Sequence, residues 1–422
     1  MKLTTLLISL LSAAAFPLHA DDWPAWRGDT LGSGKTASAE LPTEWGKEKN
    51  VRWRTDLPEG GNSTPVVWKD HVYVTQPEMG GKARNLLCFN RKDGSLLWKK
   101  GLVYEEEERT HRTNLYCSAS PAVDEARVVV SFGSAGLVCY DHDGEILWQR
   151  DLGAIDHVWG NSTSPVIHGD LLIHYHGPAK NAVLYGLNKV TGETVWKWNE
   201  PVWEPGKRTD GFGDREGEGV IGSFSTPILV ETGERTELIM SFPLEMKAFD
   251  PATGDVLWTC EGLNPLVYTS PVYNDGVVVA MGGYYGNSIG VKVGGSGDVT
   301  ESHRLWQEVR HNGGIGSGVA KDGKIYYQET GGIAYCDDMK TGKTIWRARL
   351  PGAGKSWGSF VLAGDNIYTL SQAGDSVLFK ASPEGFQVVA QSELGEHTNS
   401  SVAPAGDELF IRTHEGLWCI GE

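Results

Sequence analysis

Basic residues, adjacent cysteines and long apolar segments are all scarce in this 422-residue sequence. Lys and Arg number 38 against 54 Asp and Glu, which gives a formal net charge of −16 at pH 7. A chain this acidic is repelled by phosphate backbones and by anionic membrane surfaces. The charge balance therefore predicts that nucleic acid is not a partner.

A sustained apolar run is found at the start of the sequence and nowhere after it. Lys2 gives a short positive start, Leu3 to Leu18 is mostly apolar, and Ala20 ends a small-residue exit, as in a secretory signal peptide. No later stretch approaches the roughly 18 apolar residues of a spanning helix, and no Cys follows the cleavage region. The sequence predicts a signal peptide over 1–20, cleaved near Ala20, no transmembrane segment, and a periplasmic or secreted protein that is not a lipoprotein.

Motifs of common catalytic and metal centres are also missing. There is no Gly-x-Ser-x-Gly elbow, no Gly-x-x-x-x-Gly-Lys-Ser/Thr phosphate loop and no His-Glu-x-x-His pair. His174 and His176 project from one side of a strand end, but a metal ion needs more ligands than two. No metal site is predicted.

Glycine and tryptophan, in contrast, are abundant, and they recur in a repeat. A tight turn followed three or four residues later by Trp appears at Asp93-Gly94, Asp143-Gly144, Thr191-Gly192, Thr253-Gly254 and Thr341-Gly342. A looser copy runs from Gly297-Asp298 to Trp306, and a degenerate copy without Trp runs from Glu384-Gly385 to Val389. Ahead of each comes a small residue, often Pro, and an apolar pair. The eight copies are Thr64-Pro65-Val66, Ser120-Pro121-Ala122, Ser164-Pro165-Val166, Thr226-Pro227-Ile228, Ser270-Pro271-Val272, Gly318-Val319-Ala320, Phe360-Val361-Leu362 and Val402-Ala403-Pro404.

Each repeat unit has room for four short strands, which is the pattern of a β-propeller blade. The last unit has three strands, and the strand Val51–Arg54 near the N-terminus carries a Trp without a preceding blade. A strand from one end of the chain that completes a blade from the other end closes the ring and removes both free edges. The prediction is an all-β, eight-bladed β-propeller of four-stranded antiparallel blades over 50–422, closed by an N-terminal strand, with 21–49 as an N-terminal extension.

At this level of detail the sequence resembles a known family. The run from Leu137 to Trp148, with Asp143-Gly144, and its copies resemble the pyrroloquinoline-quinone (PQQ)-like repeat of eight-bladed propellers. The start Asp22-Trp23-Pro24-Ala25-Trp26-Arg27-Gly28 resembles the entry segment of exported, BamB-like members. The resemblance implies a superfamily that includes quinoprotein dehydrogenases, the outer-membrane assembly lipoprotein BamB and many exported proteins without an assigned activity.

The repeated Trp is interpreted as a docking side chain between blades and not as a cofactor box, because one Trp per blade on the outermost strand buries a large area. The predicted structural residues are Trp53, Trp98, Trp148, Trp196, Trp258, Trp306 and Trp346. Four of the six Cys, at 88, 139, 336 and 419, occupy one repeat position on third strands, where other blades have Ala248 or Gly186. Equivalent positions of different blades lie too far apart for a disulfide, so six free thiols are predicted.

The loops between blades and between second and third strands emerge on one face, which we call the loop-rich face. Loops on a rigid ring, carrying His, Arg, Asn and Trp, are the expected place for a ligand, although any single side chain could instead cap a strand end. The candidate ligand-binding residues are Arg109, His111, Arg112, Asn114, His157, Trp159, Asn161, Arg208, Asp210, Arg215, Tyr268, Tyr285, His311, Asn312, Trp357, His397 and Asn399.

Three functions remain open at this point. The leading hypothesis is an exported, non-catalytic, monomeric propeller that binds an envelope or extracellular protein, a glycan or a small molecule, with no cofactor. The first alternative is a PQQ-dependent quinoprotein oxidoreductase with calcium, although the vicinal Cys pair of such enzymes is missing. The second is a carbohydrate-active hydrolase or lyase that uses carboxylates such as Glu204, Asp210 or Glu245.

Overall fold

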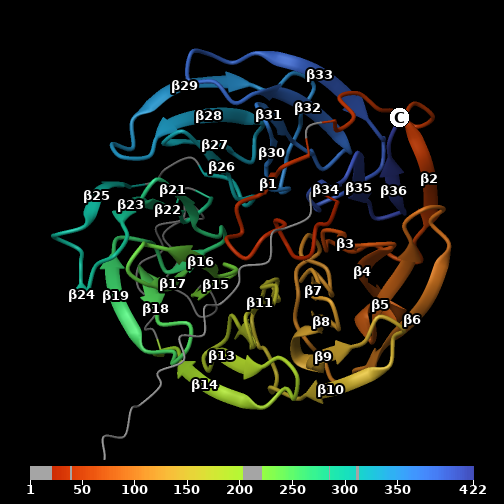
Figure 1. Cartoon of the computed structure of the whole chain (residues 1–422), viewed down its shortest axis with the longest axis horizontal. Helices are drawn as coiled ribbons and strands as arrows, with labels where there is room; N and C mark the ends of the chain where they lie inside the picture. The colour runs from red at the N-terminus through yellow and green to blue at the C-terminus, as the bar shows by residue number, and fades with distance from the viewer. Residues whose placement is uncertain (1–20, 39, 203–220, 285, 310–312) are drawn as a thin grey trace, which may run out of the picture.

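The computed structural model describes residues 21–38, 40–202, 221–284, 286–309 and 313–422. The predicted signal peptide over 1–20 lies outside these ranges. Eight four-stranded antiparallel sheets follow one another around a ring (Figure 1), and the described helices are two 3₁₀ turns, η1 (Met79–Gly81) and η2 (Gly133–Ala135). The predicted all-β, eight-bladed propeller is confirmed. No helix within the described ranges is long and apolar enough to cross a membrane.

In each blade the first strand lies nearest the centre of the ring and the last strand lies at its rim (Figure 1). Blade 1 consists of β3 (Val66–Trp68), β4 (His71–Glu78), β5 (Ala83–Asn90) and β6 (Leu96–Val103), and blade 2 of β7 (Ala122–Val123), β8 (Val128–Ser131), β9 (Leu137–Tyr140) and β10 (Ile146–Arg150). Blade 3 consists of β11 (Val166–His168), β12 (Leu171–His176), β13 (Val183–Asn188) and β14 (Thr194–Asn199), and blade 4 of β16 (Ile228–Glu231), β17 (Thr236–Ser241), β18 (Glu245–Phe249) and β19 (Val256–Glu261). Blade 5 consists of β21 (Val272–Asn274), β22 (Val277–Met281), β23 (Ser288–Lys292) and β25 (Arg304–Glu308). Blade 6 consists of β26 (Val319–Lys321), β27 (Lys324–Gln328), β28 (Ile333–Asp338) and β29 (Thr344–Arg349), and blade 7 of β30 (Val361–Ala363), β31 (Asn366–Tyr368), β32 (Asp375–Lys380) and β33 (Val388–Glu393).

Blade 8 combines strands from both ends of the chain. β34 (Ala403–Ala405), β35 (Glu408–Arg412) and β36 (Gly416–Ile420) come from the C-terminal end, and β2 (Val51–Asp56) pairs antiparallel with β36 as the outermost strand. Three further short pairings are parallel: β1 (Lys35–Thr36) with β30, β15 (Gly222–Ser223) with β20 (Leu266–Val267), and β24 (Gly297–Asp298) with β19.

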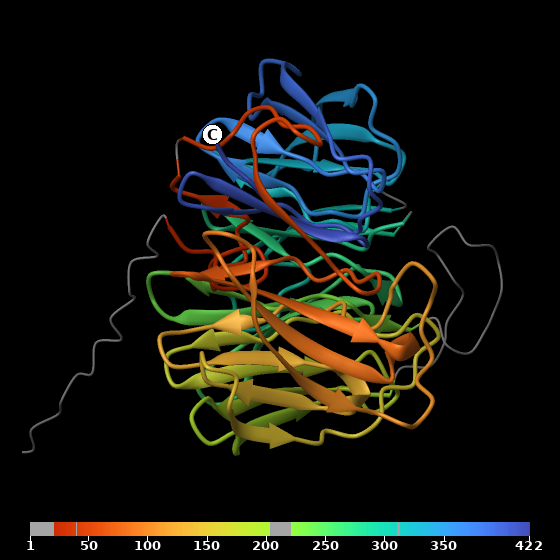
Figure 2. The same ribbon diagram turned by 90° about the vertical axis from the view of Figure 1, so that its right-hand side faces the viewer.

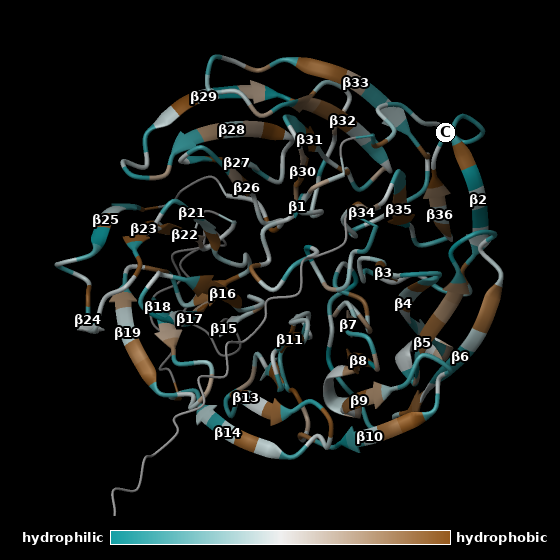
Figure 3. Cartoon of the chain, in the orientation of Figure 1, coloured by the Kyte–Doolittle hydropathy of each residue, from teal (hydrophilic) through white to brown (hydrophobic). Residues whose placement is uncertain are grey.

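Apolar strands fill the interior of the blades, and polar residues dominate the turns (Figure 3). Seven tryptophans, which we call the tryptophan layer, lie on outermost strands, each opposite a small residue of the third strand. The pairs are Trp53–Cys419, Trp98–Cys88, Trp148–Cys139, Trp196–Gly186, Trp258–Ala248, Trp306–Gly290 and Trp346–Cys336. A Cβ added at Gly290 would lie 2.2 Å from Trp306. The third-strand residue therefore has to be small because the indole of the neighbouring strand lies over it.

Most of the indole N–H groups connect their blade to the next one. Six of them donate to a backbone carbonyl in the following blade, at 2.8–3.0 Å; the acceptors are the carbonyls of Arg91, His142, Lys189, Pro251, Met339 and Ser382. Trp258 instead donates to the Glu237 carboxylate. Trp53, Trp148, Trp196 and Trp258 are buried, whereas Trp98, Trp306 and Trp346 are partly exposed. Six of the seven indoles thus bond to the following blade, and Trp258 bonds within its own blade.

All six cysteines are buried and free, as predicted. Burial raises the pKa of the Cys336 and Cys260 thiols to about 11 and that of Cys88 to about 12. Because only the thiolate is a strong nucleophile, these cysteines act as small apolar residues.

Blade 7 departs from this pattern. Its outermost strand has Ala390 where the other blades have Trp, and the residue opposite is the larger Leu378. The hydrophobic cluster that contains Ala390 also contains Trp45 of the N-terminal extension, whose ring stacks on Tyr368 with centroids 6.3 Å apart. The missing indole is thus replaced by one from elsewhere in the chain.

The N-terminal extension, red in Figure 1, crosses the centre of the ring, and Figure 2 shows its start on one face. Its backbone bonds to innermost strands: Trp23 with Val67 of blade 1, the Pro24 carbonyl with the N–H of Val123 in blade 2, and the Gly34 carbonyl with the N–H of Leu362 in blade 7. The fully buried Arg27 guanidinium donates to five backbone carbonyls, among them Ser317 and Gly318 of blade 6. The extension is therefore an integral part of the central channel.

Candidate functional site

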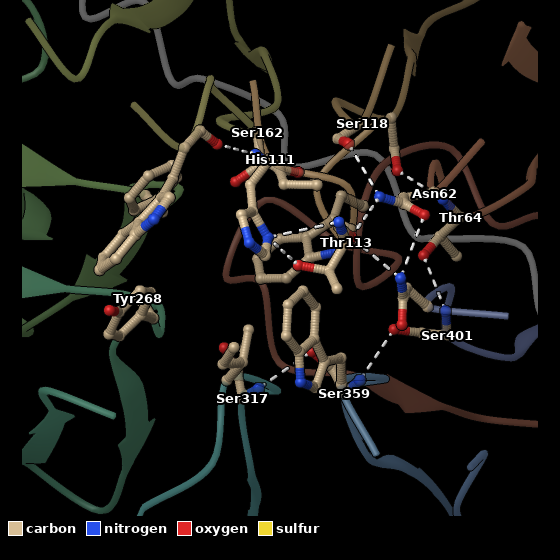
Figure 4. Close-up of a pocket in the computed structure, with 18 of the residues that line it drawn as sticks. Asn62, Thr64, His111, Thr113, Ser118, Ser162, Tyr268, Ser317, Ser359 and Ser401 are labelled. Atoms are coloured by element: carbon tan, nitrogen blue, oxygen red, sulfur yellow. Dashed lines mark hydrogen bonds between the residues drawn. The ribbon is translucent and has the colours of Figure 1, made fainter. Parts of the chain in front are cut away.

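Eight hydroxyl side chains, one before the innermost strand of each blade, form a closed hydrogen-bonded cycle that we call the hydroxyl ring. Each oxygen accepts the backbone N–H of the equivalent residue in the preceding blade, at 2.8–3.2 Å, and the last N–H, of Ser401, donates to Thr64. Figure 4 shows the part from Ser317 to Thr64. The members in order are Thr64, Ser120, Ser164, Thr226, Ser270, Ser317, Ser359 and Ser401.

A cavity of about 450 Å³ opens at this ring on the loop-rich face. Seven ring members line it, and Trp26 of the N-terminal extension reaches it from within the channel. The other lining residues come from the loops: Asn62, His111, Arg112, Thr113, Asn114, Ser118, Trp159, Ser162, Phe224, Tyr268, Tyr284, Ile315, Lys355, Trp357, Gln372 and Asn399. The size is within the range of sites for small molecules.

One wall of the cavity is aromatic. Tyr268 stacks on Trp159, with centroids 6.0 Å apart, and on Phe224, with centroids 5.8 Å apart. Tyr284 contacts Tyr268 at a tilt, and Trp357 adds another lining ring. Stacked rings of this kind offer flat apolar faces together with polar edges.

The polar part of the lining includes positive charge. Arg112 and Lys355 are exposed at the cavity, and neither has an ion-pair or side-chain hydrogen-bond partner among the described residues. Of the residues that the structure describes, no Asp or Glu lines the cavity. The site is therefore a positive region on a protein of net charge −16.

Seven of the predicted binding residues line this cavity: His111, Arg112, Asn114, Trp159, Tyr268, Trp357 and Asn399. Six others lie outside the described residues: Arg208, Asp210, Arg215, Tyr285, His311 and Asn312. The remaining four, Arg109, His157, Asn161 and His397, do not line it.

Those four residues have other contacts. Arg109 pairs with Asp156 at 2.6 Å on the surface, and Asn161 donates to the buried Glu108. His157 lies behind the aromatic wall, where burial lowers its pKa to about 4. His397 is exposed and packs edge-on against His414. These contacts lie outside the cavity lining.

The contributors that escaped the sequence interpretation include the hydroxyl ring, Trp26, Phe224, Lys355 and Gln372. The ring had a visible signal, because Thr or Ser begins five of the eight repeated signatures and directly precedes the other three. Trp26 had none, because its position depends on the path of the extension.

His174 and His176 belong to no group of three or more His, Cys, Asp or Glu among the described residues that could hold a metal ion. Neither ring nitrogen of His174 has a partner in the described structure, and burial lowers its pKa to about 3. His176 bonds through Nε2 to the Gly153 carbonyl at 2.9 Å. The pair packs between strands as neutral side chains.

A family model described as outer membrane protein assembly factor BamB matches residues 82–348 and 245–421, which is most of the chain. The chain belongs to the BamB family. This confirms the resemblance to PQQ-like, BamB-like propellers. No curated protein matches the chain.

Solved structures of two functional classes are similar to this chain. BamB from Moraxella catarrhalis has a TM-score of 0.61 and 13% identity, covering 87% of this chain and 96% of that one. Quinohemoprotein alcohol dehydrogenase from Comamonas testosteroni has a TM-score of 0.71 and 11% identity, and the match covers 95% of this chain and 81% of that one. Quinohemoprotein alcohol dehydrogenase ADHIIG from Pseudomonas putida HK5 has a TM-score of 0.67 and 12% identity, and the match covers 95% of this chain and 80% of that one. Identities this low show the fold alone.

The dehydrogenases raise the question of whether a quinone with calcium would fit this cavity. Calcium takes about six to eight oxygen ligands, among which carboxylates are prominent. The described lining has no carboxylate, and Asn62 Oδ1 and Asn399 Oδ1 already accept hydrogen bonds from protein groups. The described residues also contain no group of three or more His, Cys, Asp or Glu that could hold a metal ion. The residues that the structure describes around the cavity do not fit a quinone–calcium centre.

Proposed function

We propose that this protein is a non-catalytic binding propeller whose central cavity takes a glycan or another small ligand at the loop-rich face. The observation that carries the proposal is the cavity of about 450 Å³ on the hydroxyl ring, with an aromatic wall and a Trp26 contribution from within the channel. Concave sites with aromatic walls and a few convergent polar groups are the usual form of ligand sites.

The test is direct binding. Calorimetry and tryptophan fluorescence with a panel of saccharides and small molecules should give saturable, one-to-one binding. Trp357→Ala should abolish or strongly weaken it, because the variant removes a lining ring. The matched control is Val389→Ala, an exposed residue on an outermost strand, which should bind normally. A panel without any ligand would contradict the proposal.

The two catalytic alternatives have less support. Glu245 pairs with Lys247 at 2.8 Å and does not line the cavity, while Glu204 and Asp210 lie outside the described residues. We expect no dye-linked alcohol oxidation after loading with PQQ and calcium, and no release of reducing sugar from polysaccharides. Turnover in either assay would favour the corresponding enzyme.

We also infer a location in the envelope or outside the cell, as a monomer without a lipid anchor. The family's description as an outer membrane assembly factor supports this location and a protein partner, as does the signal-peptide pattern of the first twenty residues. Mass spectrometry of the exported protein should find an N-terminus near Asp21 without lipid, and light scattering should find one chain per particle. A retained leader or a cytoplasmic product would contradict this inference.

A further inference from the structure

The hydroxyl ring leaves its own hydrogens unused. A Ser or Thr hydroxyl has one hydrogen to donate and two lone pairs to accept with. Each ring oxygen accepts an N–H, but no described residue accepts a hydrogen bond from any of these hydroxyls. Seven of the hydroxyls line the cavity, and each of these residues is at least nine-tenths buried. The base of the cavity therefore has a set of hydroxyls that can donate to a ligand.

Positive charge lies at the same cavity. Arg112 comes from the loop that enters blade 2, and Lys355 comes from the loop that enters blade 7. Many other basic side chains of the described surface are paired, as Arg109 is with Asp156 and Lys321 is with Asp365. Two unpaired cations and no described carboxylate in the lining favour an anion, because charge-assisted hydrogen bonds to an oxyanion are about twice as strong as neutral ones.

The rest of the lining indicates which kind of molecule carries the anionic group. The aromatic wall offers flat faces, and Asn114 Oδ1 and Gln372 Oε1 are acceptors without a partner among the described residues. A flat aromatic acid would cover such amide oxygens without bonding them, which is unfavourable for buried polar groups. A sugar ring can stack on the wall and donate its hydroxyls to the amides.

We propose that the ligand is an acidic saccharide, a sugar ring that carries a carboxylate or sulfate group. The ring stacks on the wall formed by Trp159, Phe224 and Tyr268, and the anionic group is bound by the hydroxyl ring and by Arg112 and Lys355. This inference rests on the proposed binding function and names its ligand class.

The test uses matched pairs of ligands on the full-length protein: glucuronate with glucose, galacturonate with galactose, short oligomers of each, and sulfated with unsulfated sugars. The acidic member should bind at least about tenfold tighter than its neutral twin, the effect of roughly one strong hydrogen bond. Its affinity should fall as salt increases, because exposed charges are screened.

Variants separate charge from shape. Arg112→Gln with Lys355→Gln should lower the acidic-to-neutral ratio by about tenfold or more, whereas Arg109→Gln should leave the ratio unchanged. Ser317→Ala and Ser270→Ala each remove one acceptor from the ring, but only Ser317 lines the cavity. Both should lower the melting temperature, and only Ser317→Ala should weaken acid binding.

Each outcome decides the proposal. Equal binding of acidic and neutral sugars overturns the anion preference while leaving the binding function intact. Binding of an aromatic polycarboxylate, such as PQQ, without binding of saccharides overturns the sugar assignment. If no ligand of the panel binds, the proposed function fails together with this inference.

Discussion

The outer and inner rims of the propeller repeat in different ways. At the outer rim, seven blades pair an indole with a small residue, and blade 7 reverses the sizes with Leu378 and Ala390. At the inner rim, all eight blades have a hydroxyl that accepts an N–H from the preceding blade. Packing can tolerate an exchange of volume between partners, but a buried N–H needs an acceptor. The outer rim is therefore specified by volume and the inner rim by hydrogen bonding.

The largest effect is expected from breaking the outer rim at its most buried point. Trp258 is fully buried and its indole donates to Glu237, so Trp258→Ala should cost about 3–5 kcal/mol of unfolding free energy. Trp346→Ala should cost less, because Trp346 is partly exposed. Chemical denaturation of both variants measures the difference. An equal loss would mean that burial does not determine the contribution of the tryptophan layer.

A second test transplants the reversed pair of blade 7 into blade 6. Cys336→Leu alone should cost about 1–3 kcal/mol through overpacking against Trp346. With Trp346→Ala added, the leucine occupies part of the space that the indole vacates, so the double variant should lose about 0.5–3 kcal/mol less than the sum of the two singles. Additive losses would show that the leucine does not compensate for the missing indole.

The inner rim should respond to chemistry and not to size. Ser359→Ala leaves the buried N–H of Ser317 without its acceptor and should cost about 1–3 kcal/mol. Ser359→Thr keeps the acceptor and should be nearly neutral, as Thr64 and Thr226 show. Thermal unfolding of the two variants distinguishes these outcomes. Comparable losses in both would indicate that the position is limited by space.

Acid should spare both rims, since neither the indoles nor the ring hydroxyls titrate. His174 of β12 does titrate, and its pKa of about 3 in the folded protein is below about 6.5 in an unfolded chain. The unfolded state therefore binds the proton first, and stability falls as the pH drops below about 6.5. The loss at pH 5.5 should be about 1 kcal/mol from this residue. Calorimetric melting at pH 7.5 and 5.5 should show a smaller difference for His174→Leu than for the wild type; an unchanged difference would exclude His174 as the source.

The blade pattern could be predicted from sequence because its cause is local. Turn, strand and Trp recur within a few residues, and Cys88 and Gly186 occupy one repeat position for a reason visible in any single blade. The loop-rich face could be predicted from strand direction alone, which explains why Trp159 and Trp357 were among the candidates.

What could not be predicted depends on contacts between distant parts of the chain. The Ser401 N–H donates a hydrogen bond to the Thr64 hydroxyl, 337 positions away in the sequence. The repeat pattern does not indicate that a Ser or Thr side chain bonds to a neighbouring blade. His157 and Trp159 are on the same loop, and both were predicted to bind the ligand. The His157 side chain lies behind the aromatic wall, whereas Trp159 lines the cavity. Such differences are set by side-chain direction at the ends of loops.

The path of the N-terminal extension has a consequence for biosynthesis. Trp26 is among the first described residues made, yet Arg27 beside it bonds to Ser317 and Phe360, which are made much later. Contacts this distant in sequence form late, after shorter-range structure is in place. The base of the cavity is therefore assembled only when nearly the whole chain has emerged and folded. A nascent or C-terminally truncated chain lacks a complete site, so ligand binding reports that synthesis has been completed.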